Sequence, residues 1–295
     1  MSMTFARVLA GGAAAATIGT FAAAEVPRVA TDIAPVHGLV ARVMEGLGEP
    51  DLVVQPGSSP HAYSMRPSEA RALEEAQAVF WIGPELTPWL GDTIETLASD
   101  AEVIELLDAP GATLLEFRDG ATFGDHEHAS AGHEEHGHEA QGHEEHDHEE
   151  HDEHAHEQAG HDGHDHDGLD PHAWLDPENG KLWLDVIARE LAALDPGNAE
   201  AYQDNAEAGK DEIDAAAAEA RETLAAAGEL DFVVFHDAYQ YFESRFGLAA
   251  AGAISVSDAS DPTPARVEEI RGTVRDLGVS CVFSEPQFDQ RLVRT

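Results

Sequence analysis

Residues 198–227 read NAEAYQDNAEAGKDEIDAAAAEARETLAAA. This stretch is rich in alanine and in charged residues, contains no proline and has only a thin apolar stripe. This pattern predicts one long helix with most of its surface in water. A helix with so little apolar surface favours a position across two folded lobes over a position inside one of them.

Short apolar runs alternate with helical patterns on both sides of this stretch, which is typical of α/β units around a parallel sheet. Before it we expect strands at 28–33, 51–55, 78–82 and 102–107, helices at 36–47, from 67, at 85–98 and from 177, and a hairpin arm at 114–117. After it we expect strands at 231–235, 250–255 and 280–283, and helices at 238–246 and 264–277. The predicted fold is α/β, with two lobes built on mostly parallel sheets.

Residues 125–167 interrupt the first series with fourteen histidines, sixteen acidic residues and no lysine or arginine. Such a run cannot bury enough apolar surface to offset the entropy of ordering, so we expect a flexible loop. Neutral imidazoles between carboxylates suit zinc best, with copper and nickel as competitors. The alternative is a solvated acidic tract without a metal.

These histidines are expected to form weak metal sites. They are His126, His128, His133, His136, His138, His143, His146, His148, His151, His154, His156, His161, His164 and His166.

The overall composition limits the classes of partner. The formal net charge is −42, and the acidic excess persists outside the histidine run, so binding to nucleic acid or anionic lipid is not expected. Residues 1–24 combine an early arginine, an apolar stretch and a run of small residues before Glu25, which predicts a secretory signal peptide. No cysteine follows the apolar stretch, so we expect no lipid anchor and a periplasmic location.

Four histidines lie outside the run. His37 is expected early in a helix, where a structural role is the default. His61 follows a predicted strand, His172 lies between two prolines, and His236 ends a predicted strand, so these three are candidates for one zinc site. Their separations of 111 and 64 residues follow from the numbering, and spacing alone does not show that they meet.

Five motifs together resemble the periplasmic zinc-binding receptors of ABC importers, the ZnuA-like branch of the cluster 9 metal receptors. They are SPHAYSMRPSEA (59–70), WIGPEL (81–86), DPHAWLDPENG (170–180), FHDAYQYFESRFGL (235–248) and FSEPQF (283–288). The acidic, histidine-rich insert between the first two metal histidines adds to the resemblance.

The resemblance implies two α/β lobes joined by a long rigid helix, with the metal in the cleft between the lobes. It implies His61, His172 and His236 as the ligands of a tight Zn²⁺ site. The fourth position stays open, because Pro60 stands where some members have a carboxylate. A water or a mobile acidic side chain is one alternative, and a carboxylate from a C-terminal region absent from this sequence is the other.

The same resemblance implies that Cys281 pairs in the family with a cysteine beyond Thr295, so its partner is expected to be absent from this chain. The last residues, 291–295, carry no glycine or proline stop, and we expect the second lobe to be incomplete. The expected divisions are a signal peptide (1–24), an N-terminal lobe (25–124, completed by 169–197), the histidine-rich loop (125–168), a linking helix (198–228) and a C-terminal lobe (229–295).

The expected function is non-enzymatic: high-affinity capture of zinc and its delivery to an ABC permease and its ATPase by a monomeric receptor. A manganese and zinc receptor, or a zinc buffer without a permease, is the nearest alternative. A secreted zinc hydrolase is a more distant one, with Glu285 or Asp237 as its base, because three histidines and an open position also describe catalytic zinc. In the zinc receptor the histidine-rich loop is expected either to collect zinc and deliver it to the tight site, or to sense excess metal and cover that site.

Overall fold

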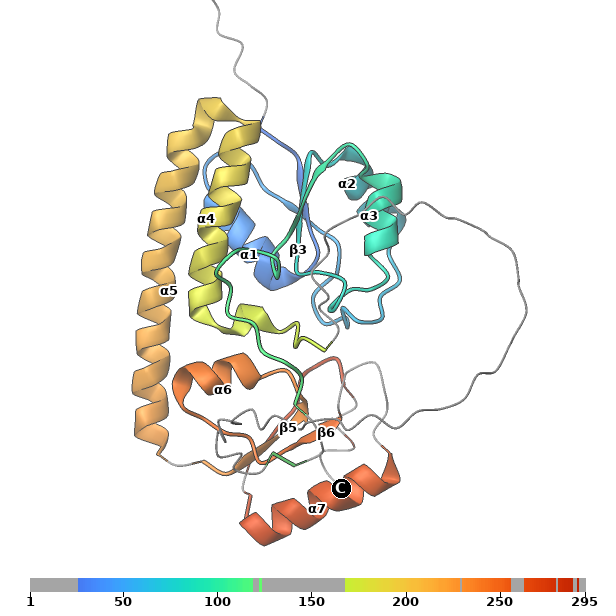
Figure 1. Ribbon diagram of the computed structural model, residues 1–295, viewed down its shortest axis with the longest axis vertical. Helices are drawn as coiled ribbons and strands as arrows, with labels where there is room; N and C mark the ends of the chain where they lie inside the picture. The colour runs from blue at the N-terminus through green and yellow to red at the C-terminus, as the bar shows by residue number, and fades with distance from the viewer. Residues whose placement is uncertain are drawn as a thin grey trace, which may run out of the picture.

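The structure is a computed structural model that describes residues 26–118, 122–123, 168–228, 230–255, 263–279, 281–288 and 291. The expected signal peptide and the fourteen histidines of the run lie outside the described residues. Within these ranges the chain folds into two α/β parts with a long helix beside them (Figure 1). None of the described helices is long and apolar enough to cross a membrane.

The N-terminal lobe is built on a four-stranded parallel sheet in the order β2-β1-β3-β4. Its strands are β1 (Val29–Thr31), β2 (Asp51–Leu52), β3 (Ala78–Trp81) and β4 (Glu102–Glu105). Buried residues, all apolar except Thr31, fill β1 and β3 because both faces of the sheet are covered. Parallel strands end at the same edge, so the loops that follow them gather on one side of the lobe.

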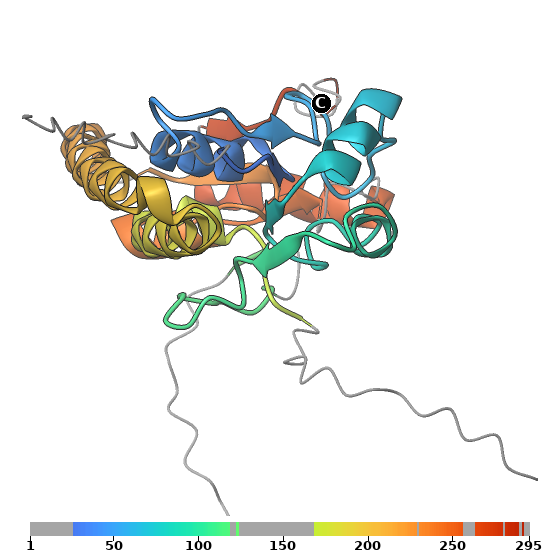
Figure 2. The same cartoon turned by 90° about the horizontal axis from the view of Figure 1, so that it is seen from above.

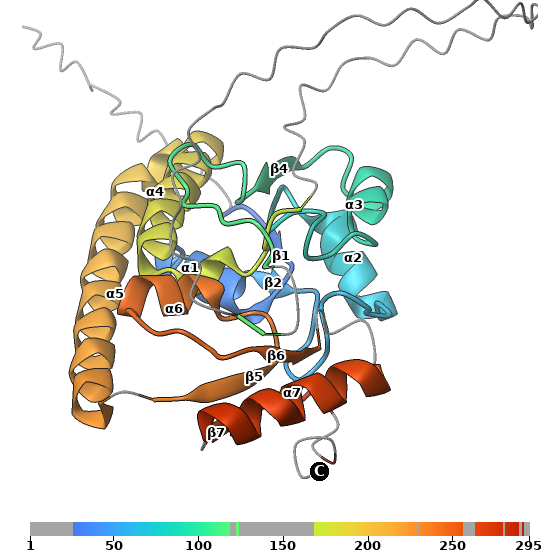
Figure 3. The same ribbon diagram turned by 60° about the horizontal axis from the view of Figure 1, so that its bottom comes forward.

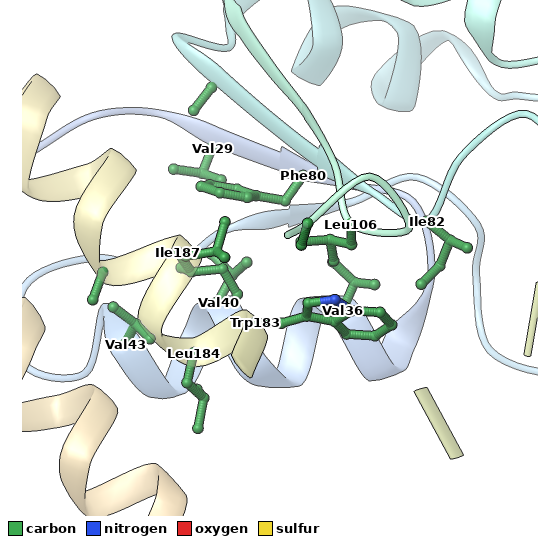
Figure 4. Close-up of a cluster of buried hydrophobic side chains, with 14 of the residues drawn as sticks. Val29, Val36, Val40, Val43, Phe80, Ile82, Leu106, Trp183, Leu184 and Ile187 are labelled. Atoms are coloured by element: carbon green, nitrogen blue, oxygen red, sulfur yellow. The ribbon is translucent and has the colours of Figure 1, made fainter. Parts of the chain in front are cut away.

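Alternate residues of the strands enter two different cores. Val29 and Phe80 point to one face and pack with Val36, Trp183 and Ile187 (Figure 4). That face is covered by α1 (Ala34–Val43) and α4 (Pro177–Leu194), whereas α2 (Pro67–Glu75) and α3 (Gly91–Leu97) cover the other face. The side-chain period of two in a strand produces this division.

The spine of the molecule is the pair α4 and α5 (Ala199–Ala227). Seen from above, the two helices run side by side along one edge (Figure 2). With 29 residues, α5 is about 43 Å long at 1.5 Å per residue, so it continues past α4 and reaches the second lobe. There Arg221 lies over the ring of Phe246, 5.4 Å from its centroid. The long helix across two lobes is therefore confirmed.

The C-terminal lobe has a three-stranded parallel sheet in the order β6-β5-β7. Its elements are β5 (Phe232–His236), α6 (Gln240–Phe246), β6 (Ala253–Ser255), α7 (Pro264–Leu277) and β7 (Cys281–Phe283). Helices α6 and α7 lie on opposite sides of β5 and β6 (Figure 3). Capping fixes α7: the Thr263 hydroxyl accepts from Arg266 N at 3.3 Å, and Gly278 ends the helix at φ +69°.

Two helices of the structure cover less of the chain than the ranges expected from the sequence, 85–98 and 36–47. Residues 85–90 form turns before α3, because Pro88 has no N–H to continue a helical ladder. Helix α1 ends at Val43, and the turn after it contains Gly46 with φ +78°. The hairpin arm at 114–117 is present only as a bridge between Glu116 and Leu169.

Candidate metal-binding site

His61, His172 and His236 come from three separate segments and line one cavity of about 190 Å³. His61 lies in the loop between β2 and α2, His172 precedes the short 3-10 helix η1 (Ala173–Leu175), and His236 is the last residue of β5. The sites at the carboxyl ends of strands β2 and β5 thus face each other across the two lobes. The sequence-predicted triad is brought together.

His172 is fixed by the carboxylate two residues before it. Asp170 Oδ1 lies 2.6 Å from His172 Nδ1 and also accepts a hydrogen bond from the backbone N–H of His172 at 3.0 Å. Both side chains are almost completely buried. Because a carboxylate only accepts, His172 Nδ1 carries the hydrogen and Nε2 carries the lone pair. Asp170 therefore sets both the tautomer and the direction of the imidazole.

His236 has the same arrangement with a different carboxylate. Its Nδ1 lies 2.8 Å from Oε1 of Glu285, which follows β7 in the C-terminal lobe. The second carboxylate oxygen of Glu285 is buried and has no hydrogen-bond partner among the described residues. The ring of Phe288 lies 5.2 Å from the His236 ring, centroid to centroid, and gives it an apolar neighbour.

His61 is placed by its loop. Trp89 Nε1 donates a hydrogen bond of 2.7 Å to the carbonyl of Pro60, directly before His61. The His61 ring lies 5.8 Å from the His172 ring, centroid to centroid. It is half-buried, whereas the other two histidines are buried, so His61 is on the open side of the cavity.

The Nε2 atoms of His172 and His236 approach to 3.4 Å. With both Nδ1 atoms donating to carboxylates, two lone pairs face each other at this distance. Two facing lone pairs repel unless a proton or a metal cation lies between them. Within the described residues no three His, Cys, Asp or Glu side chains are already arranged to hold a metal ion.

The remaining walls of the cavity are apolar or neutral. Trp174 and Leu175 of η1 line one side, and Ala238 and Tyr239 line the other. Burial, together with the Glu285 carboxylate, raises the pKa of the Tyr239 phenol, so the hydroxyl keeps its proton at neutral pH. A cavity of this kind strengthens the attraction between a cation and the Glu285 carboxylate, the one acidic group among its lining residues.

His37 is not part of this site. Its Nε2 lies 3.1 Å from the carbonyl of Pro50, which agrees with the structural role expected for it. Cys281 begins β7 and is exposed. The fourteen histidines of residues 125–167 lie outside the described residues.

Sequence reasoning did not identify the two carboxylates that hydrogen-bond to the candidate histidines. Asp170 is two residues before His172 in the DPHAWLDP motif, and that spacing is the signal that could have found it. Glu285 was considered only as the base of a hydrolase, although it stands in the FSEPQF motif. Neither motif reveals the pairing by itself, because the contact between Glu285 and His236 joins residues 49 apart in the sequence.

Comparison with known proteins points to one family. A family model described as "Zinc-uptake complex component A periplasmic" (ZnuA) matches residues 29–295. The high-affinity zinc uptake system protein ZnuA of Brucella abortus (strain 2308) is 45% identical over 287 residues, covering 97% of this chain and 85% of that protein. The protein of the same description from Paracoccus denitrificans (strain Pd 1222) is 47% identical over 282 residues, covering 95% and 83%.

Among solved structures, the periplasmic zinc binding protein TroA from Treponema pallidum aligns with a TM-score of 0.68 at 18% identity, covering 91% of this chain and 81% of that one. At this level of identity the likeness shows the fold. It supports the description of two α/β lobes joined by a long helix.

Proposed function

The chain belongs to the family of periplasmic zinc-uptake component A proteins, and we propose that it captures zinc in the periplasm for an ABC importer. The family consists of solute-binding receptors. For such a receptor zinc is cargo, so the site has to hold the ion firmly and still release it.

The observation that carries the proposal is the 3.4 Å separation between His172 Nε2 and His236 Nε2. Zn²⁺ binds imidazole nitrogen at about 2.0–2.1 Å, and two ligands at tetrahedral angles are then about 3.4 Å apart. The pair therefore already has the spacing of two zinc ligands. The carboxylates behind both rings hold the hydrogens on Nδ1, so a bound ion would find both lone pairs directed at it.

We assign His61 as the third ligand. Because it is half-buried and stands on a loop rich in glycine, proline and serine, a small movement of the loop brings it inward. A water takes the fourth position, because Glu285 is the one carboxylate among the residues that line the cavity and its bond to His236 Nδ1 keeps it behind that ring. Three histidines with an exchangeable fourth position suit an ion that must later be passed on.

The histidine-rich residues 125–167 serve this site as a collector. Their many imidazoles and carboxylates hold zinc weakly at high local concentration. The described residues end at Phe123 before this segment and resume at Gly168, four residues before His172. The signal peptide of residues 1–24 directs export, and the receptor acts as a monomer that docks on a permease driven by an ATPase.

Titration with zinc and a competing chelator tests the site. The protein should show one tight site and several weak ones, and His172→Ala and His236→Ala should each abolish the tight site while the weak ones remain. His37→Ala is the matched control, because His37 is bound to Pro50 and should leave the tight site unchanged. Unchanged tight binding in the first two variants would refute the assignment.

A second titration separates zinc from manganese. Three imidazoles favour zinc over the harder manganese ion, so competition by manganese should be weak. Equal competition would favour the broader metal receptor, and growth of a deletion strain that needs no added zinc would favour a buffer without a permease.

A further inference from the structure

An arginine outside the metal site joins the lobes beside it. Arg118 is the last described residue before the gap at 119–121, and it lies on the segment that follows β4 and descends between the two lobes to the C-terminal sheet (Figure 1). Its guanidinium bridges two carboxylates of the C-terminal lobe, those of Asp237 and Glu243. All three side chains are buried or nearly so, with 18%, 6% and 5% of their surfaces exposed.

The geometry of this cluster is that of a fixed fork. Arg118 Nε lies 3.1 Å from each carboxylate oxygen of Asp237, and Nη2 also contacts Asp237 Oδ1. Nη1 and Nη2 reach the two oxygens of Glu243 at 2.8 and 3.0 Å. The guanidinium also lies 3.8 Å over the ring of Phe123. Arginine suits this position because its planar group meets each carboxylate with two N–H donors in a fixed geometry, whereas lysine offers a single charged nitrogen.

Each carboxylate is tied to a different part of the C-terminal lobe. Asp237 directly follows His236 at the end of β5, and Glu243 lies in α6, where its Oε2 also accepts from the backbone N–H of Ala250 at 2.9 Å. Arg118 thus connects the segment before the histidine-rich run to the residue beside a metal ligand.

The segment that carries Arg118 is itself held to the other metal ligand. Leu115 O accepts from Asp170 N at 2.8 Å, and Phe117 N donates to Gly168 O at 2.8 Å. The Tyr241 hydroxyl accepts from Leu115 N at 2.9 Å and donates to Asp170 O at 2.8 Å. Asp170 in turn orients His172. A continuous chain of contacts therefore runs from His172 through Asp170, the 115–118 segment and Arg118 to the residue next to His236.

We propose that Arg118 is a positioning residue of the zinc site: by fixing the end of β5 against the 115–118 segment, it sets the separation of His236 from His172 and slows the release of zinc. The inference rests on the proposed zinc-receptor function and names no new ligand of the ion.

The test is the rate at which the full chain gives up zinc to a chelator in stopped flow, where the tight site is the slow phase. Arg118→Gln should speed that phase about tenfold, the lower end of the effect of removing an outer-shell partner. Arg118→Lys keeps the positive charge but not the planar guanidinium. It should be more stable than Arg118→Gln and should still release zinc faster than the wild type. The spectrum of bound Co²⁺ should change in Arg118→Gln, because the two imidazoles no longer meet the ion at the same angles.

Arg245→Gln is the matched control. Arg245 of α6 also bridges the lobes, with Nε and Nη2 at 2.8 and 2.6 Å from the two oxygens of Asp176, but it contacts no residue adjacent to His236. It should lower the midpoint of thermal unfolding with little change in zinc release. If both variants speed release equally, Arg118 acts only through general docking of the lobes and the inference fails.

Failure of the proposed function gives a different result. In that case the wild-type chain shows no slow phase at all. The inference is then judged on a metal-free crystal structure of Arg118→Gln: an unchanged distance of 3.4 Å between His172 Nε2 and His236 Nε2 would overturn it.

Discussion

His172 Nε2 and His236 Nε2 lie 3.4 Å apart, although the two residues belong to different lobes and are 64 positions apart in the sequence. Each ring is held from behind by a carboxylate, Asp170 for one and Glu285 for the other. The lobes therefore meet with two imidazole lone pairs already directed at the same point. A receptor assembled in this way spends little binding free energy on rearranging these two ligands.

Removal of Asp170 should weaken the tight zinc site by about 10–100-fold, because an outer-shell carboxylate fixes the tautomer of its histidine and raises its basicity. Asp170→Ala tests this by competition titration. Asp195→Ala is the control: its carboxylate is equally buried and accepts from Asn198 and Tyr202, far from the metal histidines. Equal losses of zinc affinity in the two variants would mean that only folding is affected.

Glu285→Gln should weaken the site less than Glu285→Ala. A glutamine oxygen still accepts the hydrogen of His236 Nδ1, so the ring keeps its direction and loses only the charge behind it. The expected loss of affinity is about 10-fold for glutamine and up to about 100-fold for alanine. A loss of affinity in Glu285→Gln as large as that in Glu285→Ala would contradict this role of the glutamine oxygen.

Much of the fold follows from local sequence. Pro177 opens α4, and the Asp176 side chain accepts from Glu178 N at 2.9 Å, as the pattern of a cap followed by proline predicts. Helix α7 has the bounds 264–277 that its sequence indicates. These elements are predictable because the signals that start and stop them lie within a few residues of one another.

The site is less predictable, because it depends on contacts between distant segments. Single residues and strand ends made His61, His172 and His236 candidates, but only the packing of two lobes shows that they share a cavity. The sequence around Arg118 gave no indication of its role, although arginine and lysine are rare in this acidic chain. Its meaning depends on Asp237, 119 positions later, and no local pattern encodes that pairing.

Asp32 should make the stability of the protein fall as the pH rises from 5 to 8. Its carboxyl is fully buried directly after β1, and burial raises its pKa from 3.8 to about 7. Hydrogen bonds from the N–H groups of Ile33 and Ile82 lower the pKa, but the effect of burial is larger. The folded state therefore holds a proton that the unfolded state has lost. Between pH 5 and 7 the free energy of unfolding should therefore fall by about 3 kcal/mol, at 1.36 kcal/mol per pH unit.

Urea unfolding of the wild type and of Asp32→Asn at pH 5 and pH 8 measures this effect. The asparagine variant should be the less stable of the two at pH 5, because its amide group faces a backbone N–H that needs an acceptor. The gap between the two proteins should shrink at pH 8, where the wild type has to bury a charge. A gap that stays constant would mean that Asp32 is ionised throughout this range.

Two helix glycines should respond oppositely to alanine. A Cβ at Gly272 in α7 would have nothing within 4 Å, so Gly272→Ala should raise the free energy of unfolding by about 0.5–1 kcal/mol through the lower entropy of the unfolded chain. A Cβ at Gly209 in α5 would lie 3.0 Å from Leu184 Cδ1 and 3.1 Å from Arg42 Cγ. Gly209→Ala therefore overpacks the contact between α4 and α5.

The cost of overpacking a well-filled core is about 1–3 kcal/mol, so Gly209→Ala should be less stable than Gly272→Ala by that amount. Both substitutions gain the same helix propensity, and the difference between them isolates the close approach of the two helices. Thermal and urea unfolding of both variants measure it. Equal stabilisation by the two alanines would show that α5 can move away from Leu184 at no cost. The contact between α4 and α5 would then not fix the relative position of the two lobes.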